Sequence, residues 1–174
     1  MLRDGYGATS TNRIATEADI SPGSLYQYFP NKESVLAAIV ERYSADVSER
    51  VTASLADRFD ETGPAMVRAT LHALLDALED NTELLRVVSD ELPRSENSVR
   101  ADALEQRITG LMSAYLAARR PLLGRDVAPT TAAWIMVRAI ENLTVRYVLD
   151  RPPIERDDFV AELEHLVTAY LPEA

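Results

Sequence analysis

Apolar residues recur every three or four positions through most of the chain, and no stretch shows the sustained apolar and polar alternation of a half-buried strand. Prolines and glycines divide this helical pattern into blocks. No such residue lies between Asn31 and Gly63, which predicts one long helix of about 25 residues and about 37 Å. Further helices are predicted at residues 64–80, from Thr82, at about 98–119, at 129–149 and at 156–171. The sequence therefore predicts an all-α protein.

The segment SPGSLYQYFPNKES, residues 21–34, gathers three aromatic residues beside the only lysine of the chain. Ser21 is a favoured N-cap and Pro22 suits the first helical position, so a short helix is predicted to begin here. This helix must end by Phe29, because the following proline disfavours helical geometry in the residue before it. Leu25 and Phe29 stand four residues apart and are predicted to face inward. The outer side then carries Ser24, Tyr26, Gln27 and Tyr28.

A second short helix is predicted just upstream. Thr9, Ser10 and Thr11 offer caps for it, and its inward residues are predicted to be Ile14, Ala15 and Ala18. A turn through Asp19 and Ile20 would join it to the helix that begins at Pro22. Two short helices joined by a turn of three or four residues, the second opening with small residues, form the helix-turn-helix pattern.

The outward residues have chemistry that suits DNA. Gly23 and Ser24 lack bulk, so the helix start can approach the floor of a major groove, where Ser24 and Gln27 can hydrogen-bond base edges. Tyr26 and Tyr28 can donate hydroxyl hydrogens to phosphates, and Lys32 adds one positive charge. Thr11 and the free N–H groups beside it would form an anion site at a helix N-terminus.

The net charge of −10 at first argues against a nucleic-acid partner, since phosphate binding is usually accompanied by a basic face. The distribution of the charge along the chain weakens this argument. Residues 1–43 hold four basic and five acidic residues, a balance of −1, so the rest of the chain carries −9. The acidity belongs to the body, and phosphate contact is expected to use mostly neutral donors.

The stretch from Ala8 to Glu41, ATSTNRIATEADISPGSLYQYFPNKESVLAAIVE, resembles the DNA-binding signature of the TetR family of bacterial one-component regulators. The resemblance implies a DNA-binding domain over residues 1–43 and a ligand-binding and dimerisation domain over 44–174. It implies a dimer that reads a palindromic double-stranded operator and a small molecule that changes DNA affinity. It also implies DNA contacts from Thr11, Asn12, Ser21, Pro22, Gly23, Ser24, Tyr26, Gln27, Tyr28 and Lys32.

Two positions depart from the family's pattern. Asp19 stands where the family usually has glycine in the turn, and aspartate can adopt the left-handed conformation at some cost. The family's first helix should precede Gly5, where only Met1 to Asp4 remain. We expect either that the sequence given is shortened or that the core of this unit is incomplete.

Other chemistry finds little support. The chain has no cysteine, and His72 and His165 are far apart, so neither a metal site nor a cofactor is expected. The sequence shows no serine–histidine–acid arrangement and no phosphate-binding loop, so an enzymatic function is disfavoured. No apolar run approaches 18 residues and no signal peptide begins at Met1, so we expect a cytoplasmic protein without a membrane partner.

Several polar groups in the body have two interpretations each. Arg138, Glu141 and Asn142 suit an internal ion pair with a hydrogen-bonded amide, or groups that orient a ligand in a pocket. His72 suits an ordinary core or surface histidine, or a pocket wall. Four acidic residues that follow His72 are expected to form a solvated face: Asp76, Glu79, Asp80 and Glu83.

The sequence favours a ligand-responsive, dimeric transcriptional repressor. The last two helices carry more apolar residues than one buried stripe needs, so they are predicted to form a four-helix interface with the same helices of a second copy. In the last helix, one apolar face consists of Phe159, Leu163, Leu166 and Tyr170, and this face is widened by Val160, Val167 and Leu171. A mainly hydrophobic effector, with an acidic or carbonyl group facing Arg138, is predicted to contact Leu71, His72, Leu75, Leu111, Met112, Tyr115, Trp134, Arg138 and Asn142. The alternative is a small-molecule-binding or adaptor dimer that has lost DNA binding.

Overall fold

The computed structural model describes residues 10–56, 63–91 and 94–171, and within these ranges the chain forms helices and no strand. The predicted all-α class is confirmed. The helices are α1 (Thr11–Glu17), α2 (Pro22–Tyr28), α3 (Lys32–Ala56), α4 (Pro64–Glu79), α5 (Thr82–Arg86), α6 (Arg94–Arg119), α7 (Pro129–Asp150) and α8 (Arg156–Tyr170), with a π-helical turn at Val87–Glu91 and a 3-10 turn at Arg120–Leu122. None of the described helices is both long and apolar enough to cross a bilayer.

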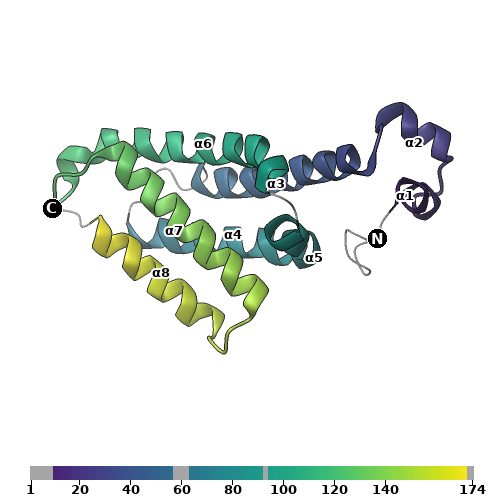
Figure 1. Cartoon of the computed structure of the whole chain (residues 1–174). Helices are drawn as coiled ribbons and strands as arrows, with labels where there is room; N and C mark the ends of the chain where they lie inside the picture. The colour runs from purple at the N-terminus through teal and green to yellow at the C-terminus, as the bar shows by residue number, and fades with distance from the viewer. Residues whose placement is uncertain (1–9, 57–62, 92–93, 172–174) are drawn as a thin grey trace.

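Figure 1 shows two unequal parts joined by one helix. The small part, called the head below, consists of α1, α2 and the first turns of α3. The large part, called the body, contains the remainder of α3 together with α4 to α8. Because α3 projects from the body, α1 and α2 stand at one end of the molecule, and the last turn of α8 lies toward the opposite end.

The helix boundaries follow the breakers in the sequence. The long helix α3 has 25 residues, as predicted. Pro64 and Pro129 open α4 and α7, where the missing proline N–H costs nothing. The prediction for α6 was wrong at its start, since this helix begins at Arg94 and not near Ser98. Proline restricts the residue before it and not those after it, so a helix can begin directly behind Pro93.

Each part has its own hydrophobic core. In the head, Ile14, Ala15, Leu25 and Val35 are buried together, with Phe29 and Ile39 packed against them. In the body, one core joins four helices through Leu71, Leu75, Leu78, Leu85, Val148, Leu149, Val160 and Leu163. A smaller cluster under the loop before α7 contains Leu116, Val127, Ala132 and Ala133.

One helix takes part in both main cores. Val35 and Ile39 of α3 belong to the head core, while Tyr43 and Val47 of the same helix pack against the body core. These residues are spaced four apart and therefore lie along one side of α3. The head cannot tilt relative to the body without disturbing α3 or one of these two cores.

Exposed ion pairs fasten α3 and α8 to the acidic end of α4. Arg50 of α3 pairs with Asp80, and Arg156 of α8 pairs with Asp76 and with Glu79. The predicted solvated acidic face is therefore exposed but largely paired, because arginines from two other helices reach it. Exposed pairs of this kind contribute little to stability because water and salt screen them, so they orient the helices more than they stabilise the fold.

The turn of the head closes as a Schellman motif. The N–H of Ile20 donates to the carbonyl of Ala15 at 3.0 Å, and that of Asp19 donates to Thr16 at 3.2 Å. Asp19 adopts the left-handed conformation, with φ of 54°. Ala18 was predicted to face inward, but it is the C-cap of α1 and is exposed, because the chain leaves the helix there. The left-handed residue is what turns α2 away from α1.

This geometry predicts the effect of substitutions at Asp19. A left-handed residue with a Cβ costs about 1–2 kcal/mol, which glycine avoids and aspartate partly offsets by local hydrogen bonding. We expect Asp19→Gly to protect the backbone amides of α1 and α2 from hydrogen exchange at least as well as the original chain. Asp19→Ala should reduce that protection by about 1 kcal/mol. Equal or better protection with alanine than with glycine would show that the turn does not depend on the left-handed conformation.

Candidate nucleic-acid interface

Helix α2 begins and ends where the sequence predicts. The hydroxyl of Ser21 accepts the backbone N–H of Ser24 at 3.0 Å, and Pro22 occupies the first helical position. The helix closes at Phe29, whose N–H donates to the carbonyl of Leu25 at 2.9 Å. A helix of only two turns is marginal in isolation, so its position depends on the packing of Leu25 in the head core.

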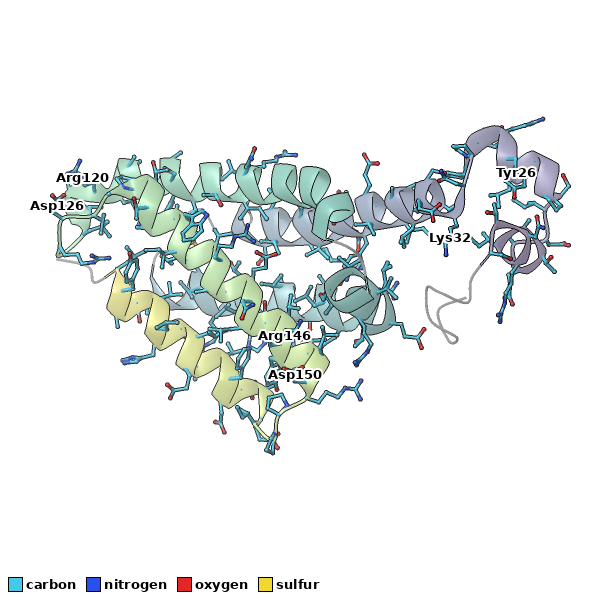
Figure 2. All side chains as sticks on the ribbon, in the orientation of Figure 1. Tyr26, Lys32, Arg120, Asp126, Arg146 and Asp150 are labelled. Carbon is cyan, nitrogen blue, oxygen red and sulfur yellow. The ribbon has the colours of Figure 1, made fainter. Side chains whose placement is uncertain are left out.

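The outer side of α2 presents a row of polar-tipped side chains. Leu25 is 6% exposed, whereas Tyr26 and Tyr28, which follow it on the same helix, are 49% and 79% exposed. Ser24 and Gln27 are exposed as well. Figure 2 shows Tyr26 on α2 at the end of the molecule formed by the head. The predicted inward and outward orientations on this helix are confirmed.

Gly23 leaves the start of α2 open to close approach. A Cβ at this position would meet only the Ser21 hydroxyl, at 3.8 Å, which is an ordinary contact. The chain's own packing therefore does not require glycine here, although glycine within a helix costs about 0.5–1 kcal/mol relative to alanine. The missing side chain instead gives a molecule outside the chain access to the backbone and to Ser24.

Lys32 is placed next to α2 by the cap of α3. The Asn31 side-chain carbonyl accepts the N–H of Ser34 at 2.8 Å, and the Ser34 hydroxyl accepts the N–H of Asn31 at 3.3 Å. This reciprocal cap fixes the first turn of α3, where Lys32 is half-buried. Figure 2 shows Lys32 at the same end of the molecule as Tyr26.

Helix α1 contributes the remaining predicted contacts. Ser10 is its N-cap, with the hydroxyl accepting the N–H of Arg13 at 3.3 Å. Thr11 follows as the first helical residue and is half-buried, and Asn12 is exposed. All ten residues predicted to contact DNA thus belong to the start of α1, to α2 with its cap, or to the start of α3. The structure gathers them at the head.

The nine residues predicted to bind a ligand are not gathered in one place. Leu71 and Leu75 are buried in the body core, at 2% and 0% exposure, and His72 beside them is half-buried. Met112 and Tyr115 pack on the smaller cluster, while Leu111 is 53% exposed. Trp134 and Arg138 line an open groove between α6 and α7, and Asn142 lies exposed further along α7.

The polar groups with two interpretations lie at the surface of the body. Arg138 and Glu141 form an exposed ion pair at 3.5 Å on α7, so the expectation of an internal pair was wrong. The backbone carbonyl of His72 accepts a hydrogen bond from Arg156 at 3.2 Å. Among the described residues, no three His, Asp or Glu side chains gather as a metal site requires.

Sequence reasoning missed two features of the body. The hydroxyl of Tyr43 is buried with no hydrogen-bond partner among the described residues. The groove of about 710 Å³ between α6 and α7 has a floor of small residues on α6, among them Gly110 and Ala114. A glycine within an otherwise unbroken helical pattern was the available signal for the groove, whereas no sequence signal marks a hydroxyl that lacks a partner.

Two family models match the chain. The one described as bacterial regulatory proteins, tetR family, matches residues 1–39, and the one described as tetracyclin repressor-like, C-terminal domain, matches residues 62–171. The nucleoid occlusion factor SlmA of Actinobacillus pleuropneumoniae serotype 5b (strain L20) is 29% identical over 86 residues, which is 49% of this chain and 42% of that protein. The chain therefore covers less than half the length of this curated relative.

Solved structures share the fold over nearly the whole chain. The fatty acid degradation regulator FadR from Bacillus halodurans superposes with a TM-score of 0.74 at 16% identity, covering 94% of this chain and 85% of that one. A tetR-family regulatory protein from Rhodococcus RHA1 gives a TM-score of 0.68 at 25% identity, covering 98% and 90%. Since the C-terminal family model alone spans more than half of the sequence, the chain belongs to the TetR family of transcriptional regulators.

Proposed function

We propose that the chain is a ligand-responsive transcriptional repressor of the cytoplasm that binds a palindromic operator as a dimer, with α2 as its reading helix. The observation that carries this proposal is the exposed row on α2, Ser24, Tyr26, Gln27 and Tyr28, held outward by the buried Leu25. Membership of the TetR family agrees with it, since such regulators bind DNA and act as dimers.

The chemistry of this row divides into two kinds of contact. The Gln27 amide offers a donor and an acceptor together, which suits the edge of an adenine in the major groove. The hydroxyls of Tyr26 and Tyr28 are donors on rigid rings and suit phosphates, which position the protein without reading sequence. Gly23 lets the helix start approach the groove floor, because nothing at that position projects from the backbone.

Neutral donors of this kind explain how a chain of net charge −10 can hold DNA. Each phosphate neutralised by a cation releases counterions and steepens the salt dependence of binding. The described part of the head, residues 10–39, holds two cations, Arg13 on α1 and Lys32 at the start of α3. Operator binding should therefore weaken less with added salt than is usual for a repressor with a basic face.

The dimer is proposed to form through α7 and α8. Apolar side chains remain exposed on both, with Ile135 and Leu143 of α7 at 41% and Leu166 of α8 at 49%. Leu163 and Val167, which belong to the same predicted apolar set of α8, are buried within the chain's own body. A two-fold axis near α7 would place the two reading helices about 34–36 Å apart, the spacing of successive major grooves.

The effector is proposed to enter the body core beside α3. Burial, and to a lesser extent the nearby Asp46 carboxylate, raise the pKa of Tyr43 to about 12, so its hydroxyl remains a neutral donor at physiological pH. Tyr43 packs against the core that contains Leu71 and Leu75, two of the predicted ligand residues. A mainly hydrophobic molecule with a carbonyl or carboxylate oxygen would give this hydroxyl the acceptor it lacks, and would contact α3 between its two cores.

A gel-shift assay with DNA from upstream of the chain's own gene tests the main proposal. We expect the protein to retard this DNA, and we expect the retardation to persist when non-specific competitor DNA is added. A protein that forms dimers and binds small molecules but retards no sequence preferentially would instead be the adaptor considered as the alternative.

Substitutions on α2 should have two distinct effects on DNA binding. We expect Tyr26→Phe to weaken binding to all sequences alike, by about three- to tenfold, because one phosphate hydrogen bond is lost. Gln27→Ala should reduce discrimination at one base pair, worth about 1–3 kcal/mol, and affect the others little. Binding of single-substituted operators measures both, with Tyr115→Phe in the body as a control that changes neither. The same loss of sequence preference in both α2 variants would contradict the assigned roles.

Tyr43→Phe tests the proposed effector position. A panel of hydrophobic carboxylates and ketones is screened for compounds that release the operator. We expect the variant to keep its operator affinity and to lose the response, because only the hydroxyl is removed. Linkage further requires that saturating operator weakens effector binding by the factor by which the effector weakens operator binding. Effector affinity that is unchanged by operator would show that this position is not the switch.

A further inference from the structure

An open groove of about 710 Å³ runs between α6 and α7 on the surface of the body. Its lining on α6 consists of Gln106, Thr109, Gly110, Ser113, Ala114 and Ala117, and its lining on α7 consists of Thr130, Trp134 and Arg138. The side contributed by α6 is made largely of small residues, and the large ring of Trp134 stands on the opposite side. The groove is therefore shaped to receive a bulky apolar group from outside.

Gly110 indicates that something approaches α6 closely. It lies within a helix, where glycine is less favourable than alanine by about 0.8–1 kcal/mol. Apart from its chain neighbours and the backbone of its own helix, no described atom lies within 4 Å of the position that a Cβ would take. The chain's own packing thus gives no reason for glycine here, whereas a molecule seated in the groove would require the missing side chain.

The groove also leaves groups in unfavourable surroundings. Trp134 is 55% exposed, although tryptophan carries the largest apolar surface of any residue. The hydroxyl oxygen of Thr109 is buried and has no hydrogen-bond partner among the described residues. An occupant that covers the indole ring would remove the cost of exposing Trp134.

The charge of the groove favours a second copy of this chain as that occupant. Two copies at −10 each repel one another, so they must meet where the surface is nearly neutral. Arg138 is the one charged side chain among the described residues that line the groove, and Glu141 pairs with it at 3.5 Å. The exposed Ile135 lies next to Trp134 on α7 and continues the apolar surface toward the dimer interface proposed above.

We propose that in the dimer each subunit fills the α6–α7 groove of the other, with Trp134 of each copy packed against the small residues of the partner's α6. The proposal rests on the dimeric state argued above and extends that interface from α7 and α8 to α6. A two-fold axis near Trp134 makes the arrangement self-complementary, because the same surface then supplies both the projecting ring and the groove that receives it.

Trp134 is the only tryptophan of the chain, so its fluorescence reports this contact directly. The full chain is diluted across the range in which sedimentation shows dissociation into 19.3 kDa monomers. We expect the emission to move to longer wavelength, and quenching by acrylamide to increase, over the same range. A dimer whose emission equals that of the monomer would overturn the proposal while leaving dimerisation through α7 and α8 intact.

Matched substitutions inside and outside the groove on α6 test whether dimerisation depends on the groove itself. Ala114 lines the groove and Ala118 on the same helix does not, while both are exposed. We expect Ala114→Leu and Gly110→Leu to weaken dimerisation by at least about thirtyfold, the loss typical of blocking a central aromatic anchor. Ala118→Leu should leave it unchanged, and all three should retain the circular dichroism of the original helices. Equal dimerisation of Ala114→Leu and Ala118→Leu would contradict the proposal and would leave the groove for another occupant, such as a small molecule.

Discussion

A single uninterrupted helix joins the two hydrophobic cores, and the other features of the molecule depend on it. Val35 and Ile39 attach α3 to the head, and Tyr43 and Val47 attach the next turns of the same helix to the body. The residues proposed to read DNA are held by the head core, so a displacement of α3 within the body reaches them without an intervening joint. This constraint explains why the buried hydroxyl of Tyr43 is the group through which an effector is proposed to act.

The charge of the chain is compatible with the two proposed partners, operator DNA and a second copy of the chain, because different groups are proposed to contact each of them. At the head, hydroxyl and amide groups replace most of the cations expected of a DNA-binding surface, and Lys32 is positioned by the cap of its helix. At the body, ion pairs such as Arg50 with Asp80 neutralise part of the acidic surface. The α6–α7 groove is nearly neutral, so two acidic subunits can meet there.

Much of the fold could be predicted because local chemistry decides it. Caps and prolines define α2 and α3, and four-residue spacing gives the inward Leu25 and the outward Tyr26. Predictions failed where neighbours distant in sequence decide the outcome. Arg138 and Glu141 would form an internal pair only if another helix covered their part of α7, and in this fold both remain exposed. Ala18 continues the periodicity of α1 but lies where the chain turns away. Arg50, the partner of Asp80, comes from another helix and has no local signature, and Gly110 marks only the α6 side of a groove whose other side comes from α7.

The central claim is that this chain reads a two-fold-symmetric DNA sequence through α2, and selection from a library of random DNA duplexes with the purified full chain tests it most directly. The account predicts enrichment of an inverted repeat whose half-site centres lie about 10 base pairs, or a multiple of that, apart. Gln27→Ala should enrich the same repeat with one position in each half-site relaxed. Recovery of duplexes with no common sequence, or of one unrepeated half-site, would contradict the account.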